Sequence, residues 1–452
     1  MSGDQPDLEQ IAASVLDLAD GIDAEVRVSR RIHGLTRFAN SFIHQHVSED
    51  TTTVELRVAI GGRVTSSSIT GAHGADELGA FVQRTVATAG LVPADPDWPG
   101  FGGPSGDGAN VGAEDGADEQ PEPEIDPDAR AEVVAAFVAA GADTNAAGYV
   151  DTDHVASLYV NTRGRRASGA YRRATADGIH RTDTSSGYAH ATARSVRDLD
   201  GEVLGARAAD TAARARDPEA IDPGTYEVVL APECVAEMVS FLIYDGFNAK
   251  AHLEGQSFVL LGEQQFDPAI DLVDDPTDER AIGLRFDADG TPKRRLHLVR
   301  DGVTEAMTHD RRTAHRAGTR STGHALPGGA MWGALATDVF VRPGDRPVPD
   351  LISQVADGLY VTTFNYVREL DPKTQVITGL TRNGVFRIRE GELAAPVRDL
   401  RFTQSSVAAL APGNVLGVAD DARFASSEFG EAIVHAPTLR LARFTFTGGE
   451  AG

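Results

Sequence analysis

Histidine is the first residue type to consider for catalysis in this chain, because its imidazole binds metals and transfers protons near neutral pH. The chain has 13 histidines. A helical zinc-protease site needs two of them one turn apart, with a glutamate directly after the first. Here no histidine is followed by glutamate, and no two lie four or five positions apart. The spacing therefore predicts no helical zinc site.

The most closely spaced pair is His44 and His46, which a strand would place on one face. No third ligand is evident beside them, so we interpret the pair as part of a polar sheet face. His309, His315 and His324 lie in an Arg-rich segment at spacings that match no ligand pattern. Surface or supporting roles are favoured for these three.

The single cysteine, Cys234, has apolar neighbours in a segment expected to be helical. Such a cysteine is typically a small buried side chain with an unactivated thiol. One cysteine also excludes an internal disulfide and a zinc site with several thiolates. The nucleophile motif Gly-x-Ser-x-Gly is absent, and the glycine-rich stretch 102–106 has neither the preceding strand nor the following lysine of a phosphate loop.

Hydrophobic periodicity predicts the elements that would position these residues. Alternation from Val54 to Ile60, then Gly61-Gly62 and a second alternating run, predicts a hairpin, because both glycines can adopt positive φ. Helical spacing from Leu8 to Leu18 predicts a first helix. Asp126-Pro127 is typical of an N-cap followed by proline at the first helical position.

The second half begins with a predicted strand from Tyr226 to Leu230 and a helix from about Glu233 to Tyr244. Later strands meet at turns such as Asp301-Gly302 and Glu390-Gly391. The predicted fold class is α+β. We expect an N-terminal domain of antiparallel sheet with helices and a C-terminal domain of large antiparallel, barrel-like sheets with a few helices.

Residues 93–126 differ in composition from both halves. Between Glu114 and Asp128 there are eight acidic residues and no basic one. Such a segment cannot bury enough apolar surface to offset its ordering entropy, so we expect an acidic flexible loop, with an acidic docking arm as the alternative.

The whole chain has 452 residues, with 67 acidic against 42 basic ones and a formal net charge of -25. This acidity argues against binding nucleic acid or an anionic membrane surface. No signal peptide and no apolar run of transmembrane length is present, so the cytoplasm is the expected location.

A series of short motifs runs through the second half in a characteristic order. In chain order the motifs are Gly255-Gln256-Ser257-Phe258, Asp274-Asp275-Pro276, Phe286-Asp287-Ala288-Asp289-Gly290, Arg300-Asp301-Gly302-Val303, Ser321-Thr322-Gly323-His324-Ala325, Asp338-Val339-Phe340-Val341-Arg342-Pro343-Gly344, Gly358-Leu359-Tyr360-Val361 and Glu390-Gly391-Glu392. In this order and spacing they resemble the TldD/PmbA family. The resemblance covers roughly Asp23 to the C-terminus and favours two domains, 1–222 and 223–452.

The resemblance implies a cytoplasmic metalloprotease system whose TldD-type subunit carries zinc. That subunit has a His-Glu-x-x-x-His helix after the strand that opens the C-terminal domain, and a cysteine near the C-terminus. The matching helix here, from Glu233 to Leu242, contains no histidine, and the segment from Phe424 to Gly430 contains no cysteine. The chain therefore resembles the TldE (PmbA) branch, which lacks the metal-binding motif. We expect no catalytic residue and no metal ligand here, zinc only in the partner, and Glu237 on a solvated face.

The implied role is that of a metal-free partner subunit in a heterodimer that degrades or processes unfolded peptides. An extended peptide can bind by adding a strand to a sheet edge, which needs no catalytic side chain. Two alternatives stay open. One is a homodimeric peptidase that uses His309, His315 or His324, and the other is a non-enzymatic modulator of gyrase or of toxin–antitoxin components.

Three family-like loops are the candidates for lining a peptide cleft. They contain Ser257, Thr322, Gly323, His324, Arg382, Asn383 and Gly384. The alternative interpretation is that the glycines serve turns and that Ser257 caps a strand end. Residues 362–367 lack the glycines common in the family, and this bulkier loop would narrow a cleft.

Overall fold

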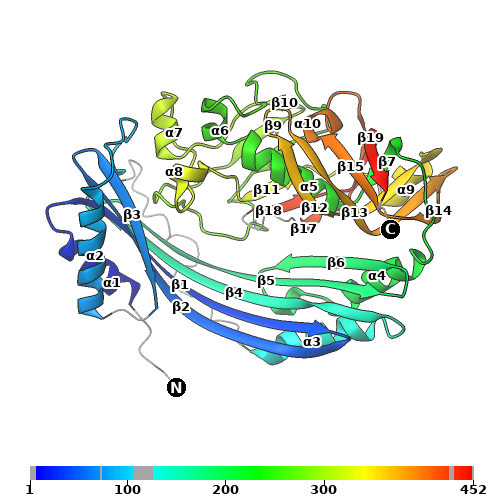
Figure 1. Ribbon diagram of the computed structural model, residues 1–452, viewed down its shortest axis with the longest axis horizontal. Coiled ribbons are helices and arrows are strands. Elements are labelled where there is room, and N and C mark those ends of the chain that lie inside the picture. Colours follow the sequence, from blue (N-terminus) through cyan, green and yellow to red (C-terminus); the bar gives the residue numbers. More distant parts are fainter. Residues whose placement is uncertain (1–6, 72–73, 105–125, 427–431, 450–452) are drawn as a thin grey trace.

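The protein is described by a computed structural model that covers all residues except 1–6, 72–73, 105–125, 427–431 and 450–452 (Figure 1). It confirms the predicted α+β class, with mostly antiparallel sheets and helices in both halves. Part of the predicted flexible loop lies outside the described residues. Among the described residues, no helix is both long enough and apolar enough to cross a membrane.

The N-terminal half is one antiparallel sheet with helices on its outer face. Its elements are α1 (Leu8–Leu18), β1 (Asp23–Ala39), β2 (Phe42–Ile60), β3 (Arg63–Thr70), α2 (Ala75–Ala89), α3 (Pro127–Ala139), β4 (Asn145–Asn161), β5 (Arg166–Arg181), β6 (Ser186–Ala193), the 3₁₀ turn η1 (Val196–Asp198) and α4 (Gly201–Arg214). The strand order is β3-β2-β1-β4-β5-β6, so β6 is an edge strand.

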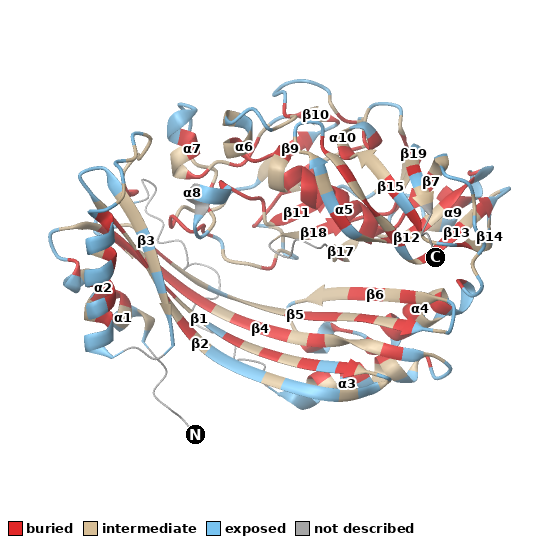
Figure 2. Cartoon of the chain, viewed as in Figure 1, coloured by how far each residue is buried: buried red, intermediate tan, exposed pale blue. Residues whose placement is uncertain are grey.

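Strand alternation separates the two faces of this sheet. Val26 and Val28 of β1 are fully buried under α1 and α2. The residues between them in the chain point the other way, toward the C-terminal half, because successive side chains of a strand alternate. Arg27 is one of these, and its guanidinium bonds the Glu55 carboxylate on β2. The sheet thus has an apolar outer face and a charged inner face, and buried residues alternate with less buried ones along its strands (Figure 2).

The local predictions for this half hold. Ile60 pairs with Arg63 across Gly61 and Gly62, whose φ angles are +57° and +77°, as a tight hairpin turn requires. Asp126 caps α3 by accepting a hydrogen bond from the backbone N–H of Asp128.

The C-terminal half contains two sheets. Its elements are β7 (Gly224–Leu230), α5 (Pro232–Phe241), the π-helical turn η2 (Leu242–Gly246), α6 (Ala249–Leu253), β8 (Leu272–Asp274), β9 (Leu296–Arg300), β10 (Val303–Thr304), α7 (Arg311–Arg316), α8 (Gly329–Trp332), β11 (Asp338–Val341), α9 (Val348–Ser353), β12 (Asp357–Asp371), β13 (Val376–Arg389), β14 (Glu392–Val397), β15 (Leu400–Ser405), α10 (Ser406–Ala409), β16 (Val415–Val418), β17 (Arg423–Ala425), β18 (Ile433–Ala436) and β19 (Leu439–Gly449).

One of these sheets closes into a barrel. Strands β12, β7, β19, β15 and β13 pair in that order, and β13 pairs back with β12. The other sheet has the order β10-β9-β8-β11-β18-β17, so β17 is an edge strand. The predicted turns are confirmed, since Asp301 and Gly302 have φ angles of +46° and +82°, and Glu390 and Gly391 of +51° and +82°.

The two halves are joined at one end of the N-terminal sheet by a buried charge cluster. Arg57 of β2 contacts Glu25 of β1 at 3.0 Å and Asp289 of the C-terminal half at 2.9 Å. The Tyr159 hydroxyl donates to Glu25 at 2.6 Å. Burial of the Glu25 carboxyl, only partly opposed by Arg57, raises its pKa to about 7. The boundary near residue 223 stays a prediction.

The beginning of the predicted flexible loop also joins the halves. Asp95 pairs with Arg312 of α7 at 3.0 Å, and Phe101 is buried against Trp98 with ring centroids 5.0 Å apart. Residues 93–104 therefore have defined contacts, and residues 105–125 lie outside the described part of the chain.

Candidate functional site

Helix α5 is the element that the family resemblance marks for metal binding. It follows β7 directly, and Pro232 occupies its first turn, where a missing N–H costs nothing. All ten of its residues are buried, since it packs against β7, β12, β17 and β18. A helix enclosed on every side leaves no open coordination position for a water or a substrate.

The donors on α5 do not fit a zinc ion. Both oxygens of Glu233 accept hydrogen bonds from Arg423, at 3.0 Å and 2.8 Å. The Cys234 thiol donates to the carbonyl of Val361, and burial raises its pKa well above the usual range. The helix offers no imidazole, and the Glu233 carboxylate and the Cys234 thiol are engaged elsewhere. The interpretation of Cys234 as a buried, unactivated thiol agrees with these contacts.

The position predicted for Glu237 was wrong. We expected it on a solvated face, but it is only 4% exposed. Its position follows from the complete enclosure of α5, which single-sequence periodicity does not reveal.

One group of three potential metal ligands is present among the described residues, on the inner face of the N-terminal sheet. His33, Asp151 and Asp153 bring ligand atoms within 4.8 Å of one another. However, Asp153 already binds Arg31 at 2.6 Å and Arg173 at 2.9 Å. Burial would raise the pKa of Asp153, but the two guanidiniums outweigh it and lower that pKa. We interpret the group as an ion-pair network.

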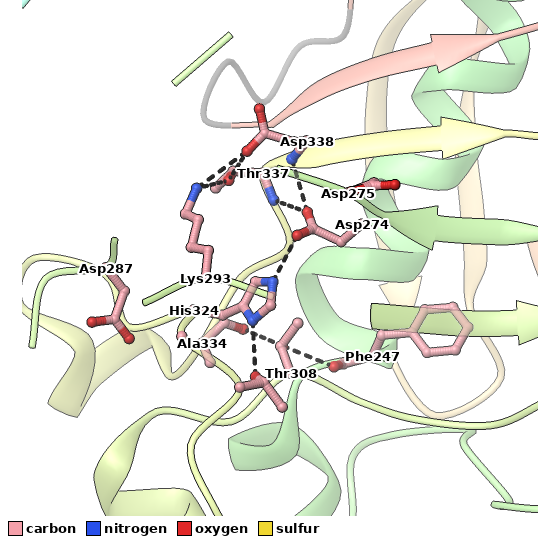
Figure 3. A network of polar contacts seen from close by, with 12 residues as sticks. Phe247, Asp274, Asp275, Asp287, Lys293, Thr308, His324, Ala334, Thr337 and Asp338 are labelled. Atoms are coloured by element: carbon pink, nitrogen blue, oxygen red, sulfur yellow. Dashed lines mark hydrogen bonds and ion pairs between the residues drawn. The ribbon is translucent and has the colours of Figure 1, made fainter. Parts of the chain in front are cut away.

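His324 lies inside the C-terminal half (Figure 3), next to the buried Gly323 and the half-buried Thr322. His324 is 1% exposed, and its Nε2 lies 2.8 Å from Asp274 Oδ2. Its Nδ1 lies 2.8 Å from the Thr322 hydroxyl, which also accepts from the His309 backbone N–H. Gly323 has a φ of +82°, and an added Cβ would come within 2.4 Å of the Pro292 carbonyl.

The same network extends to the end of β11. Asp274 also accepts backbone hydrogen bonds from Thr337 and Asp338, both at 2.8 Å. Lys293 contacts Asp338 at 3.2 Å. Burial alone would lower the pKa of Lys293, but Asp338 and Asp274 outweigh it and raise that pKa. These contacts hold β8, β11 and the loop before β9 together, so a substrate role for His324 stays a prediction.

Ser257 forms hydrogen bonds with the backbone at the end of η2. Its hydroxyl donates to the Gly246 carbonyl at 2.6 Å and accepts from the Val259 backbone N–H at 3.0 Å. This is a structural cap, and substrate contact by Ser257 is untested.

Arg382, Asn383 and Gly384 lie elsewhere, on β13 at the junction with the N-terminal half. Asn383 Oδ1 accepts from the Ser186 hydroxyl of β6 at 2.9 Å. A Cβ at Gly384 would lie 2.7 Å from Thr211 of α4. In the described contacts, this loop shares no partner with Ser257 or with His324, so the structure does not bring the three predicted loops together at one site.

The other histidines of the homodimer alternative do not converge either. His315 is exposed on α7, and burial lowers the pKa of the half-buried His309. Within the described part of the chain, these two and His324 do not form a group of metal ligands.

Sequence reasoning missed a polar cluster between α4, β12 and β17. It contains Arg207 of α4, Tyr360 of β12 and Arg423 of β17, with Glu233 and Asp421. The sequence offers no clear signal for this cluster, because Asp210 lies three positions after Arg207 and only the structure shows that it pairs with Arg214 instead.

The N-terminal sheet, the five-stranded barrel and the enclosed helix after β7 describe a two-part α+β protein. The family model described as the PmbA/TldA metallopeptidase C-terminal domain matches residues 223–448, half of the chain. The chain belongs to the TldD/PmbA family, and its fold is TldE-like.

The curated relatives share about half of their length with this chain. A metalloprotease of Methanothermobacter thermautotrophicus is 27% identical over 232 residues, which cover 50% of this chain and 49% of the relative. A metalloprotease of Synechocystis is 25% identical over 244 residues, covering 50% and 48% respectively.

Solved structures match over nearly the whole chain. TldE from Thermococcus kodakarensis has a TM-score of 0.83 and 17% identity, covering 97% of this chain and 99% of that one. A Thermotoga maritima protein proposed as a modulator of DNA gyrase has a TM-score of 0.80 and 17% identity, covering 98% and 100%. At such identities the likeness concerns the fold.

Proposed function

We propose that this chain is the metal-free partner subunit of a TldD/TldE-type metalloprotease complex in the cytoplasm. The TldD-type subunit would hold the zinc and cleave unfolded peptides. This chain would stabilise that subunit and form one wall of the peptide-binding space.

The proposal rests on two properties of α5, the absence of histidine and the burial of its side chains. This helix takes the place of the family's metal-binding helix by sequence, yet it has no histidine and all of its side chains are buried. Its first-turn carboxylate is committed to Arg423. A helix of this kind offers no zinc ligand set, which favours a metal-free role for this chain.

The inner face of the N-terminal sheet supports a role with polypeptide. It carries charged and hydrogen-bonding side chains such as Arg27, Arg31 and Asp153 along strands about as long as an extended peptide of 15 residues or more. Extended peptides bind through polar groups and sheet edges, with little demand on their sequence.

Co-expression with a TldD-type subunit tests the proposal. We expect a complex that remains intact on size-exclusion chromatography, zinc in proportion to the TldD-type subunit, and peptidase activity that falls when this chain is omitted. The TldD-type subunit alone is the control. Absence of a stable complex, together with activity that does not depend on this chain, would contradict the proposal.

Metal analysis of the purified chain tests the homodimeric alternative. Stoichiometric zinc together with peptidase activity would support that alternative. The relation in fold to a proposed gyrase modulator motivates one further test, a pull-down of gyrase subunits at moderate salt. With a net charge of -25, an effect on gyrase would act through protein contact and not through DNA.

A further inference from the structure

Helix α4 presents one face to the C-terminal half, and Arg207 lies on that face. Thr211, one turn later, approaches Gly384, and Arg214, nearly two turns later, lies over the Phe386 ring at 5.5 Å. Residues spaced four and seven positions apart share a helix face. Arg207 therefore points past the β6 edge toward β12 and β17, where Tyr360 stacks on Phe386 with ring centroids 6.4 Å apart.

The Arg207 guanidinium has five N–H donors but donates no hydrogen bond and makes no ion pair within the described residues. It is half-buried. Burial lowers the pKa of Arg207, and the nearby Arg423 cation lowers it further. Glu233, Tyr360 and Asp421 act in the opposite direction and raise it. Glu233 and Asp421 both pair with Arg423, so neither carboxylate forms an ion pair with Arg207.

Two further donors in the same cluster lack an acceptor among the described residues. Arg423 uses its Nη atoms for Glu233 and Asp421, while its buried Nε–H has no hydrogen-bond partner. The half-buried Tyr360 hydroxyl also has none. Only the Arg423 Nε–H of these donors is buried, and a buried donor without a partner costs roughly 1–3 kcal/mol. An acceptor that reached this nitrogen and the half-buried Arg207 and Tyr360 would offset that cost.

The missing acceptor must reach the cluster from solvent and must accept several hydrogen bonds at once. The Arg423 side chain is 29% exposed and that of Asp421 is 25% exposed, so the cluster is accessible. A carboxylate has two oxygens that match the fork of a guanidinium, and charge-assisted hydrogen bonds of this type are the strong ones.

We propose that Arg207, Arg423 and Tyr360 form a carboxylate-binding subsite at the junction of α4, β12 and β17. The Arg207 guanidinium binds the carboxylate, and Arg423 Nε and the Tyr360 hydroxyl complete its hydrogen bonds. Glu233 holds Arg423 in place from behind. The carboxylate belongs to an extended peptide, either at its C-terminus or on an acidic side chain, and the choice of a peptide as ligand rests on the proposed function.

Direct binding to the full-length chain, without partner or zinc, tests the subsite. The probes are one labelled peptide with a free C-terminal carboxylate, the same peptide amidated, and the amidated peptide with one internal glutamate. We expect the free carboxylate or the glutamate to tighten binding at least about tenfold over the amidated peptide. The peptide that shows the gain identifies the source of the carboxylate.

Three variants assign the residues. Arg207→Gln should remove the difference between the acidic and amidated peptides, and Tyr360→Phe should reduce it about threefold to tenfold. Arg84→Gln, on the exposed face of α2, is the matched control and should change nothing. Circular dichroism verifies that each variant is folded.

Two results would overturn the subsite: equal affinity for all three peptides, or the same affinities for Arg207→Gln as for Arg84→Gln. Failure of the subsite and failure of the proposed function remain distinguishable. A stable, active complex with a TldD-type subunit can form without any carboxylate preference in this chain, and this chain can bind carboxylates without forming that complex.

Discussion

The Glu233 carboxylate and the Arg423 guanidinium bind each other across 190 residues of sequence, through one Arg423 nitrogen that lies 3.0 Å and 2.8 Å from the two carboxylate oxygens. Glu233 belongs to the first turn of α5, where the helix dipole favours a negative charge. Arg423 belongs to the edge strand β17. The pair therefore fastens the buried helix to the rim of the second sheet.

Breaking this pair should be costly. The Glu233 side chain is 8% exposed and that of Arg423 is 29% exposed, so Glu233→Gln leaves a largely buried cation with a weaker partner. We expect a loss of about 3 kcal/mol in the free energy of unfolding, measured by urea denaturation. The control is Asp278→Asn, whose pair with Arg280 is more exposed and should cost less than about 1 kcal/mol. Equal effects in both variants would contradict the assignment.

Gly34 should tolerate no side chain. An added Cβ would lie 2.3 Å from Nη1 of Arg130, which is 1% exposed and bonds the hydroxyls of Thr36 and Thr152. Gly34→Ala should cost about 2 kcal/mol in thermal or urea unfolding. Gly79→Ala on α2, where nothing lies within 4 Å of the added Cβ, should be neutral or stabilising by up to about 1 kcal/mol. An additive double variant of Gly34→Ala with Arg130→Met would show that the contact is absent.

Stability should fall as pH rises through the range in which Glu369 titrates. Burial, followed by the nearby Asp245 carboxylate, raises the pKa of Glu369 to about 8. The folded state therefore holds this proton more tightly than the unfolded state, and the stabilisation is complete below the unfolded pKa and lost by about pH 8.

Removing this titration should flatten the pH dependence. Between pH 6 and pH 9, Glu369→Gln should lose about 1–2 kcal/mol less stability than the natural chain. The measurement is urea unfolding at a series of pH values, and Glu132→Gln on the exposed side of α3 is the control. An unchanged slope in Glu369→Gln would show that the carboxyl titrates outside this range.

A substitution of His324 distinguishes a structural role of this residue from a role in binding substrate. Its ring bridges Asp274 and Thr322 in the interior, so His324→Gln should cost about 3 kcal/mol in unfolding while peptide affinity stays within about twofold. Fluorescence anisotropy with the peptides described above measures the affinity. Lost affinity at unchanged stability would instead support the predicted contact between His324 and substrate.

Local chemistry explains what the sequence could predict. Gly61-Gly62, Asp126-Pro127 and Asp301-Gly302 form the predicted turns or caps because their backbone preferences act within a few residues. The motif series also allowed the family to be predicted, because the order and spacing of several short motifs are more specific than any one motif.

Long-range contacts explain what could not be predicted. The burial of Glu237 depends on four strands that enclose α5, and the partner of Glu233 lies 190 residues away. Arg207 is notable only because it has no acceptor among the residues that the structure describes. The three predicted loops separate for the same reason, because turn chemistry indicates a loop but not its neighbours in space.

The length of the N-terminal sheet also sets the distance between its two contacts with the C-terminal half. The C-terminal half is fastened to it at Arg57 and Asp289 at one end, and at Ser186 and Asn383 at the opposite end. Strand length sets the distance between these two fastenings, about 3.3 Å for each residue. Inserting two residues into each of β2, β1, β4 and β5 would keep every side chain on its face, yet would move one fastening about 7 Å out of reach. The two fastenings therefore set the length that these strands must have.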